Sequence, residues 1–371
     1  MKITAIETIP VRVPIKPELA IRSGRGGSHT SSPFLLVKLH TDSGLVGLGE
    51  ASCTPRWSGE DQVSAAHFIN TYFAPAIAGR DPTRIDELSP DVFSLVAGNY
   101  FTKAAVEMAL WDLAGKAAGK PVYELLGGKV RDFVPTKWSV SGRPPEQAAA
   151  IARRAFDLGF RAMKVKVGLD GDFERVAAVR NVIGRDAKLG VDANGGWGDA
   201  ATAITAIERL KPLGIAFVEQ PVPAGDPAEL ATVRRSAGLP IVADESLYTL
   251  ADAKQLARAG ACDVFSIYIG KAGGIGPAKA IADFARGQGI ACTIGSNLEL
   301  GVGSAAMIHL ALAHDGVRSD EFPCDIIGPF FYEDNILTEP LPLAGGRAVA
   351  TDIPGLGVEL DESKVDKYRV K

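Results

Sequence analysis

Three acidic residues and two lysines follow successive apolar runs in the middle of this 371-residue chain. The acids are Asp192, Glu219 and Asp244, and the lysines are Lys164 and Lys166. Carboxylates that converge in an apolar setting repel one another strongly unless a cation neutralises them. Oxygen ligands without histidine or cysteine favour Mg²⁺ over zinc, with Mn²⁺ as the alternative. The pattern therefore predicts a metal site with a base beside it, against the plainer interpretation of three unrelated, solvated acids.

Lys164 and Lys166 are two positions apart in one apolar run, so in a strand both side chains point to the same side. Near a bound dication and partly removed from water, a lysine gives up its own proton more readily. Such a lysine can accept a carbon-bound proton near neutral pH. We assign Lys166 as the general base, with Lys164 orienting it or contacting a substrate carboxylate. The alternative is that both lysines only neutralise the acids.

The elements that position these residues alternate in type. From Val134 onward, strand-like runs alternate with helix-like segments, as far as a last short strand expected at Val317–Glu321. This alternation fits a closed (β/α)₈ barrel, with a doubly wound open sheet as the alternative. The barrel is favoured because polar residues end so many of the runs, whereas an open sheet concentrates its site at one switch point. In a barrel the carboxyl ends of all strands share one mouth, which would bring the acids and lysines together.

The first 128 residues have a different pattern. Alternating apolar residues predict antiparallel strands with a hairpin turn at residues 41–44. The strands are expected at Lys2–Val13, Pro33–His40 and Gly44–Glu50. Helical spacing follows over Asp61–Ala78 and Tyr100–Gly119, and Ala104–Ala118 consists largely of strong helix formers, so this part is interpreted as an α+β unit. The Gly- and Ser-rich segment Glu18–Ser32 is either a surface loop or a lid, and the tail from Pro340 is expected to pack back on this unit.

The composition excludes several classes of protein. A net charge of −4 leaves no basic surface for nucleic acid to bind. The sequence has no run of roughly 18 apolar residues to span a membrane, and it starts without a secretory signal pattern, so a cytoplasmic protein is expected. The four cysteines form no C-x-x-C pair. Cys262 and Cys292 lie in apolar runs, which favours buried free thiols over a disulfide or a zinc ligand.

Short motifs along the whole chain resemble the enolase superfamily, in its mandelate racemase and muconate lactonizing enzyme branch. Around the predicted site they are K-x-K at Lys164–Lys166, D-x-N at Asp192–Asn194, E-Q-P at Glu219–Pro221, D-E-S at Asp244–Ser246 and K-A-G-G-I at Lys271–Ile275. Elsewhere they are K-A-A-V-E-M-A-L-W-D-L-x-G-K at Lys103–Lys116, L-L-G-G at Leu125–Gly128 and P-G-L-G at Pro354–Gly357. They stand in family order and resemble the muconate-lactonizing subgroup most.

The resemblance implies a fold and a reaction. It implies an α+β capping domain at 1–128, a modified TIM barrel, (β/α)₇β, at 129–335, and a C-terminal segment at 336–371 that packs on the capping domain. It also implies that Mg²⁺ binds the three acids and the carboxylate of a small-molecule substrate. A base removes the proton α to that carboxylate and the metal stabilises the enediolate. Family members are homo-oligomers, often dimers or octamers.

Several further residues become candidate substrate contacts through the resemblance. Asn194 and Glu245 lie in the matched motifs, while Ser296 and Glu299 lie in S-N-L-E-L-G after the seventh strand. Glu299 would contact the substrate or donate a proton, or else it is an ordinary acid near a helix start. Of the acid-x-acid pair that the family's dipeptide epimerases carry on the last strand, only Asp325 is present, which disfavours a dipeptide substrate.

The sequence departs from the subgroup at Tyr268, which stands where a second lysine usually ends the sixth strand. Tyrosine is a poor carbon base but a usable acid or hydrogen-bond donor. We therefore expect Lys166 to be the only lysine base, with Tyr268 facing it across the substrate or serving as a pocket wall. The alternative is that Lys271, beyond the strand end, is the second base.

One lysine base favours a cycloisomerase or an acid dehydratase. A racemase or epimerase of an amino-acid derivative is the first alternative, and a catalytically inactive binding protein is the second. Specificity in the family comes from capping-domain loops, which here contain Arg22, Arg25 and Arg56. These arginines could neutralise a second anionic group on the substrate, which favours a dicarboxylate. Ordinary surface arginines are the alternative interpretation.

Overall fold

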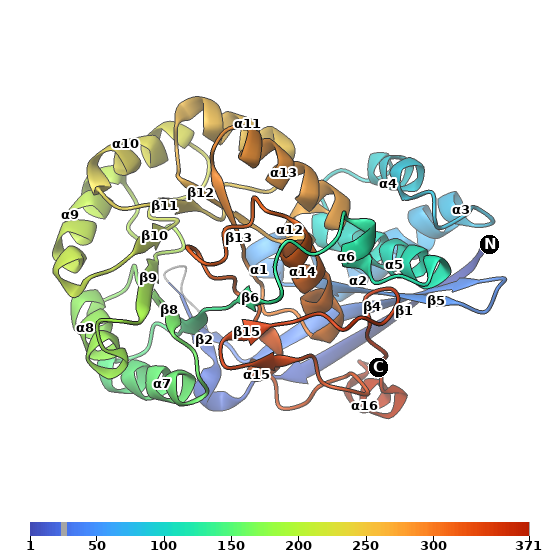
Figure 1. Ribbon diagram of the computed structural model, residues 1–371, viewed down its shortest axis with the longest axis horizontal. Coiled ribbons are helices and arrows are strands. Elements are labelled where there is room, and N and C mark those ends of the chain that lie inside the picture. Colours follow the sequence, from blue (N-terminus) through green and yellow to red (C-terminus); the bar gives the residue numbers. More distant parts are fainter. Residues whose placement is uncertain (24–27, 371) are drawn as a thin grey trace.

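The computed structural model describes residues 1–23 and 28–370. Its two parts lie side by side, a barrel ringed by helices and an α+β lobe next to it (Figure 1). Both ends of the chain lie on the side of the α+β lobe (Figure 1). We call this lobe the capping lobe.

The capping lobe is built on a three-stranded antiparallel sheet in the order β1-β4-β5. The strands are β1 (Ile3–Pro14), β4 (Ser31–Thr41) and β5 (Val46–Ser52). The predicted hairpin turn joins β4 to β5, and Gly44 supplies the positive φ of 82° that it needs. Its helices are α1 (Pro55–Ser58), α2 (Gln62–Phe68), α3 (Ala74–Ile77), α4 (Ile85–Ser94), α5 (Tyr100–Ala118) and α6 (Val122–Leu125).

Helix α5 is the central element of this lobe. It lies directly on β5. The approach is so close that a side chain at Gly47 or Gly49 would overlap the α5 carbonyls of Ala109 and Ala105, so the absence of a side chain at both positions permits the contact. Most residues of α5 are buried, since its other side faces the barrel helices. The sequence predicted this helix because its apolar residues recur at helical spacing and most of its residues are strong helix formers.

The barrel contains, within the described residues, seven parallel strands that follow one another in chain order. They are β7 (Trp138–Val140), β8 (Ala162–Lys166), β9 (Lys188–Asp192), β10 (Phe217–Glu219), β11 (Ile241–Ala243), β12 (Val264–Ile267) and β13 (Ala291–Ile294). The helices between and after them are α7 (Pro145–Asp157), α8 (Asp172–Ile183), α9 (Ala200–Leu210), α10 (Pro227–Ala237), α11 (Leu250–Ala259), α12 (Ile269–Ala272), α13 (Ile275–Gly287) and α14 (Gly301–Ala313). Most of these helices form an outer ring (Figure 1). The fold is the modified TIM barrel with a capping domain that the resemblance implied.

The strand expected at Val317–Glu321 is wrong. Its first residue makes only a single bridge to Cys292 of β13. The segment after it forms a turn, held by an ion pair between Arg318 and Glu321. Cys324 then bridges the segment before β7. In the described residues, isolated bridges of this kind take the place of a regular strand between β13 and β7. The reason is that the polar turn bonds its own backbone groups: the N–H groups of Glu321 and Phe322 donate to the carbonyl of Arg318, so they cannot pair with a neighbouring strand.

The C-terminal segments contact both parts of the molecule. The strands β14 (Leu343–Ala344) and β15 (Arg347–Ala348) pair with β6 (Val134–Pro135), just before the barrel begins. Beyond α15 (Gly328–Phe331) and these strands, α16 (Glu362–Tyr368) leads to Arg369, which bridges Val11 of β1. The domain boundaries at residues 128 and 335 stay predictions.

Two buried glutamates of the capping lobe fix it to the barrel. Glu50 accepts hydrogen bonds from the backbone N–H groups of Leu300 (2.7 Å) and Gly303 (2.9 Å), where α14 begins. Glu107 of α5 accepts from Ile275 (2.6 Å) and from Gly276 at the start of α13. The first N–H groups of a helix have no partner within the helix, so a carboxylate from another element satisfies them well. These contacts hold the lobe over the carboxyl ends of the barrel strands.

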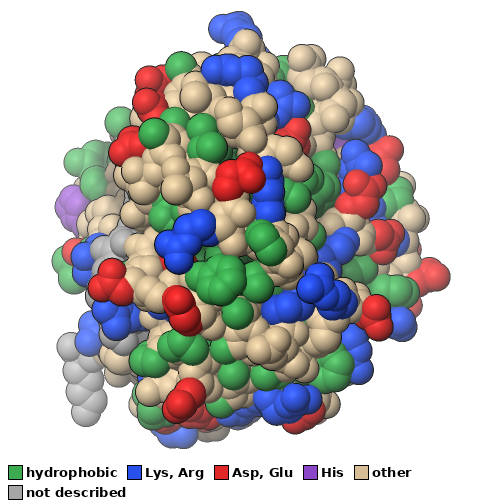
Figure 2. Space-filling model, turned by 90° about the vertical axis from the view of Figure 1, so that its left-hand side faces the viewer, with side chains coloured by type: hydrophobic (Ala, Val, Ile, Leu, Met, Phe, Trp, Pro, Cys, Tyr) green, Lys and Arg blue, Asp and Glu red, His purple; other side chains and the backbone are tan. Residues whose placement is uncertain are grey.

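The remaining global features agree with the composition. Figure 2 shows one face of the molecule, on which Lys and Arg side chains are interspersed with Asp and Glu side chains. The four cysteines are free and buried, as expected for Cys262 and Cys292. Among the helices that the structure describes, none combines the length and apolarity that a membrane crossing would need.

Candidate active site

The three acids predicted to converge do so at the carboxyl ends of neighbouring strands. Asp192 and Glu219 are the last residues of β9 and β10 and stand opposite each other in the register, and Asp244 follows β11 directly. All three are buried, and one carboxylate oxygen from each lies within 4.8 Å of the others. Parallel pairing in register therefore explains how residues so far apart in sequence form one cluster.

Each acid of the cluster has a lysine within hydrogen-bond distance. Lys166 Nζ lies 2.6 Å from Asp192 Oδ2, and Lys164 Nζ lies 2.6 Å from Glu219 Oε1. Asp244 Oδ1 is 2.5 Å from Nζ of Lys271. We call these six residues the acid–lysine cluster. Charges this deeply buried are tolerated only when they are paired in this way.

Lys164 is the most heavily surrounded of the lysines. Its Nζ also lies 3.0 Å from Asp325 Oδ2 and 3.3 Å from Asp192 Oδ2. Burial opposes its charge, but the attraction of Asp325, Glu219 and Asp192 outweighs burial and holds the pKa of Lys164 well above its usual value. Lys164 therefore stays an ammonium, which suits a structural cation better than a base.

A hydrogen-bonded chain leads from Lys166 to a second buried acid. Lys166 Nζ donates to Asn194 Oδ1 at 2.9 Å, and Asn194 Nδ2 donates to Glu245 Oε1 at 2.8 Å. Asn194 has a left-handed backbone, with φ of 48°, a conformation that asparagine tolerates better than most residues. Burial raises the pKa of Glu245 to about 7. Asn194 and Glu245, expected as substrate contacts, thus form a hydrogen-bonded chain that begins at Lys166, and their contact with a substrate stays a prediction.

The loop after β11 is fixed by Gln220, the residue that follows Glu219. Gln220 has a φ of 34° and turns its side chain toward this loop. Its Oε1 accepts from the backbone N–H groups of Asp244 (3.0 Å) and Ser246 (3.2 Å). The E-Q-P and D-E-S motifs are therefore one unit, in which the glutamine orients the strand end that contains Asp244.

The donor set suits a hard divalent cation. The three carboxylates offer only oxygen, and Glu219 Oε2 is buried with no hydrogen-bond partner among the described residues. An unpartnered buried carboxylate oxygen is costly, and a bound cation removes that cost. Oxygen ligands of this kind are typical of Mg²⁺ and Mn²⁺ sites.

Tyr268 and Lys271, the two residues about which the sequence left alternatives open, both meet Asp244. Tyr268 follows the end of β12, and its phenol donates to Asp244 Oδ2 at 2.8 Å. Burial, together with Asp244 and other nearby acids, raises the pKa of Tyr268 well above its usual value. Lys271 lies on α12, and its ammonium reaches back to Asp244, whose backbone oxygen it also contacts at 2.6 Å. The one-turn helix α12 thus returns the later lysine to the site.

The remaining candidate contacts lie in different settings. Glu299 is buried and accepts from Ser296 Oγ (2.5 Å) and from the backbone of Asn297 (3.1 Å), so its oxygens bond within its own loop. Arg22 and Arg56 are exposed, on β2 (Ile21–Arg22) and α1 respectively. Arg25 lies outside the described residues. Contacts of these residues with a substrate stay predictions.

Sequence reasoning missed three members of the site. Lys137 lies beneath the cluster, with Nζ 3.0 Å from Asp325 Oδ2 and 2.6 Å from the Pro323 carbonyl. A lysine inside the apolar run 134–140 was a usable signal for it. Asp325 had been considered only as half of an acid pair, but it joins Lys137 to Lys164. Trp57 stacks on Tyr268 with ring centroids 5.4 Å apart, a contact between the two lobes that no local pattern indicates.

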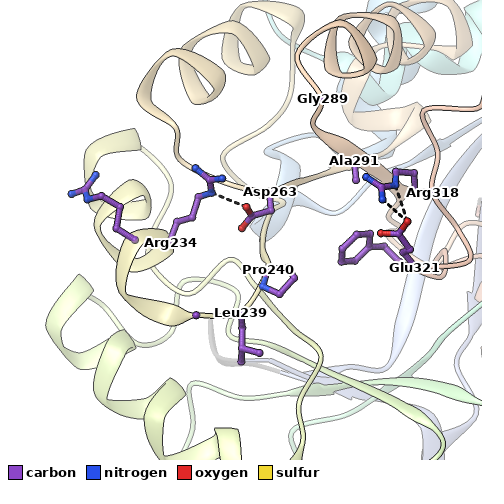
Figure 3. Close-up of a pocket in the computed structure, with 11 residues that line it drawn as sticks. Arg234, Leu239, Pro240, Asp263, Gly289, Ala291, Arg318 and Glu321 are labelled. Carbon is purple, nitrogen blue, oxygen red and sulfur yellow. Dashed lines mark hydrogen bonds and ion pairs between the residues drawn. The ribbon is translucent and has the colours of Figure 1, made fainter.

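A second hollow of about 640 Å³ lies at the opposite end of the barrel, where β11, β12 and β13 begin (Figure 3). Arg234 on its wall forms an ion pair with Asp263 at 2.8 Å, and Arg318 pairs with Glu321. Arg235 also lines the hollow and donates to Thr232 Oγ1 at 3.0 Å. Each of these arginines thus has its own partner, and among the described residues the hollow lacks the convergent carboxylates of the acid–lysine cluster. The candidate active site is therefore the cluster at the carboxyl ends of the strands.

Comparison with known families and proteins shows which family the chain resembles. Residues 5–127 match the family described as mandelate racemase / muconate lactonizing enzyme, N-terminal domain. Residues 147–364 match the family described as enolase C-terminal domain-like. The two matches together span both the capping lobe and the barrel.

Individual relatives match along the whole chain. N-succinyl-L-Arg/Lys racemase of Bacillus cereus is 33% identical, over 100% of this chain and 98% of the racemase. Muconate cycloisomerase 1 of Rhodococcus opacus is 34% identical, over 99% of this chain and 98% of that enzyme. The crystal structure of muconate lactonizing enzyme from Pseudomonas fluorescens, complexed with muconolactone, superposes with a TM-score of 0.94 at 32% identity, covering 100% of this chain and 99% of that one. The similarity thus includes enzymes of more than one reaction type.

Proposed function

Because this chain belongs to the mandelate racemase and muconate lactonizing enzyme family of the enolase superfamily, we propose that Lys166 removes the proton α to a substrate carboxylate in a reaction that needs Mg²⁺. The proposed ligands of Mg²⁺ are Asp192, Glu219 and Asp244. When bound there, the cation would stabilise the negative charge of the enediolate. The proposed substrate is a small carboxylic acid, as in the family.

The observation that carries the choice of Lys166 is its position among the three lysines of the cluster. Its side chain is 12% exposed, against 4% for Lys164 and 1% for Lys271. It is thus the lysine of the three that an incoming substrate can reach. A base must come within hydrogen-bond distance of the proton it takes. Because all three candidates are lysines, the one whose side chain a substrate can contact is the best candidate for the base.

The reaction we favour uses one lysine base, as in a cycloisomerisation or the dehydration of an acid. The neutral amine of Lys166 accepts the α proton and becomes an ammonium, while the carbon–hydrogen electron pair moves into the enediolate. In a dehydration the enediolate electron pair forms the new C=C bond and expels the β-hydroxide, which leaves as water with the proton from the Lys166 ammonium. In a cycloisomerisation the same electron pair expels a carboxylate that remains part of the molecule, and Lys166 keeps the proton until it is released to solvent. Neither route needs a second carbon base on the opposite face of the substrate, so both are compatible with a tyrosine instead of a lysine at position 268.

Racemisation or epimerisation of an amino-acid derivative is the second candidate. The similarity to N-succinyl-L-Arg/Lys racemase over the whole chain favours it. This reaction requires a proton donor on the face opposite Lys166, a role for which Tyr268 or Lys271 would have to serve. A catalytically inactive binding protein is disfavoured, because the acids and lysines are present and converge.

Hydrogen–deuterium exchange tests the proposal directly. The protein is incubated with Mg²⁺ and a panel of dicarboxylic acids, acid sugars and N-acylated amino acids in D₂O. Mass spectrometry then records deuterium at the α carbon of recovered substrate and product. We expect incorporation with the wild-type protein and none with Lys166→Ala. Lys254→Ala, which removes an exposed lysine on α11, is the matched control and keeps wild-type exchange. Equal exchange in Lys166→Ala and wild type would remove Lys166 from its role.

The metal and the assembly have separate tests. Calorimetric titration with Mg²⁺ and Mn²⁺ is expected to show binding of both, because the ligands are hard oxygens. A homo-oligomer, dimer or octamer, is supported by the family resemblance, and light scattering measures its mass. A cytoplasmic location likewise stays a proposal, which cell fractionation tests.

A further inference from the structure

We propose that Tyr268 and Lys271 form a clamp on Asp244, and that they act as positioning residues for this metal ligand rather than as a second acid or base. The inference rests on the proposed function, because it assumes that Asp244 binds a metal. It answers the question that the sequence left open at the sixth strand end.

The clamp restrains Asp244 at three atoms. Oδ2 accepts the phenol hydrogen bond of Tyr268 at 2.8 Å, Oδ1 accepts from Lys271 Nζ at 2.5 Å, and the backbone oxygen accepts from the same ammonium at 2.6 Å. Hydrogen bonds from both sides fix the rotation of the carboxylate about its Cβ–Cγ bond. Partners that orient a ligand in this way change metal affinity by roughly 10- to 100-fold when they are removed.

Lys271 is too enclosed to serve as a base. Its side chain is 1% exposed, and its Nζ lies 4.1 Å from the ring centre of Tyr268. The rings of Trp57 and Tyr248 are 5.8 Å and 5.7 Å away, so three aromatic faces surround the ammonium. Aromatic faces stabilise a cation, and the ion pair with Asp244 supplies the rest. This enclosure leaves Lys271 without the access that Lys166 has, whose side chain is 12% exposed.

The ring of Tyr268 is confined by Trp57 and by the backbone at Gly295. Trp57 stacks on one face, with the ring planes 11° apart. A side chain at Gly295, at the end of β13, would overlap the ring atoms of Tyr268, so the absence of a side chain there is what admits the tyrosine. The Trp57 stack and the close approach of Gly295 together prevent the phenol from swinging away from Asp244 toward a substrate.

The capping lobe completes the clamp through Trp57. The segment before α1 is tied to the barrel by Asn297, whose Nδ2 donates to Ser52 Oγ at 3.1 Å and Thr54 Oγ1 at 2.9 Å. The position of the capping lobe is thereby transmitted through the Trp57–Tyr268 stack to a metal ligand. A lysine at position 268 would bring a second cation beside Lys271, whereas a phenol adds a hydrogen bond without charge.

Metal affinity and isotope exchange together test the clamp. Calorimetry measures Mg²⁺ binding to wild type, Tyr268→Phe and Lys271→Met, and α-deuterium exchange is followed over a range of Mg²⁺ concentrations. We expect Tyr268→Phe to bind Mg²⁺ about 10-fold more weakly, and its lost exchange to return as Mg²⁺ is raised. Tyr72→Phe, which changes an exposed tyrosine of the capping lobe, is the control and binds Mg²⁺ like wild type.

Two further variants guard against misfolding and indirect effects. Gly295→Ala keeps the phenol but displaces its ring, so it should weaken Mg²⁺ binding as Tyr268→Phe does. Lys271→Arg keeps the positive charge and should bind Mg²⁺ more tightly than Lys271→Met. Circular dichroism confirms that each variant is folded before it is titrated.

Different results would overturn different claims. Unchanged Mg²⁺ affinity in Tyr268→Phe, with exchange lost at all Mg²⁺ concentrations, would make Tyr268 a catalytic residue and end the clamp proposal. Failure of the wild-type protein to bind Mg²⁺ would overturn the clamp together with the metal site. Persistent exchange in Lys166→Ala would overturn only the proposed base, because the affinity measurements do not depend on it.

Discussion

Lys166 and Asn194 are joined by a 2.9 Å hydrogen bond from the lysine ammonium to the amide oxygen, across the neighbouring strand ends β8 and β9. The same amide is held in place by its own hydrogen bond to Glu245. The backbone N–H of Asn194 also donates to Asp192 Oδ1 at 2.9 Å, so the asparagine contacts both the proposed base and the carboxylate beside it.

Asn194→Gly tests the amide contact with the base without straining the backbone. Glycine tolerates the φ of 48° at this position, so the change removes the amide alone. We expect α-deuterium exchange to slow about 10-fold, because the base is less well positioned, while Mg²⁺ affinity stays near that of wild type. Asn99→Gly is the matched control, since Asn99 also has a positive φ, of 53°, but lies in the capping lobe before α5. Equal slowing in both variants would contradict a specific role for Asn194.

Metal binding should stabilise the fold, because it relieves repulsion among buried carboxylates. At a free Mg²⁺ concentration 100 times the dissociation constant, linkage predicts about 2.7 kcal/mol of added stability. Thermal unfolding with EDTA and with Mg²⁺ measures the effect. Glu219→Gln should remove most of the increase in Tm, whereas Glu208→Gln, on the exposed side of α9, should keep it. A wild-type Tm that does not respond to Mg²⁺ would argue against the site.

The buried ion pairs beneath the cluster should matter far more than those on the surface. Asp325 is shared by Lys137 and Lys164, each 3.0 Å away, and all three are buried. Asp325→Ala leaves two buried cations short of a partner and is expected to cost roughly 3–5 kcal/mol in the free energy of unfolding. Asp91→Ala, which breaks a solvent-exposed pair with Arg80, should cost at most about 1 kcal/mol. Urea unfolding compares the two, and similar losses would refute the argument.

The parts of the site that sequence predicted follow from local rules. Asp192 and Glu219 end parallel strands, and residues in register on neighbouring strands are neighbours in space. Lys164 and Lys166 share a side because strand side chains alternate. The strand expected at Val317–Glu321 failed because its apolar start leads into a polar turn with an internal ion pair. Strand propensity reports a short apolar run but not whether a partner strand is in reach.

The parts that sequence did not predict depend on contacts between distant elements. Nothing in the order of residues shows that α12 is a single turn that points Lys271 back at Asp244. The stacking of Trp57 on Tyr268 requires the capping lobe to be docked, which depends on contacts such as those of Glu50 with α14. Motif order located the catalytic strands, whereas tertiary packing decides which polar groups meet there.

His309 provides a pH-dependent test of how the C-terminal segment is attached. This buried histidine of α14 accepts a hydrogen bond at Nδ1 from the backbone N–H of Tyr123 (3.1 Å), and its Nε2 lies 3.1 Å from the carbonyl of Leu356. The neutral ring with its proton on Nε2 satisfies both contacts, whereas a proton on Nδ1 would oppose the Tyr123 N–H. Burial lowers the pKa of His309 to about 4.

The sign of the effect follows from linkage. In the folded state His309 takes up a proton only near pH 4, whereas in the unfolded state it takes one up near pH 6.5. Acid therefore favours the unfolded state. The contribution of His309 to stability is present above about pH 6.5 and is lost as the pH falls toward 4. Between pH 7 and pH 5 the loss should be about 2 kcal/mol in the free energy of unfolding from urea titrations. His309→Phe, which keeps a flat ring against Tyr123, should lower stability at pH 7 but show a smaller loss on acidification. His67→Phe, at an exposed histidine of α2, should keep the full wild-type pH dependence. If His309→Phe loses as much stability on acidification as wild type does, the effect does not need His309. Other groups, such as carboxylates, would then account for it.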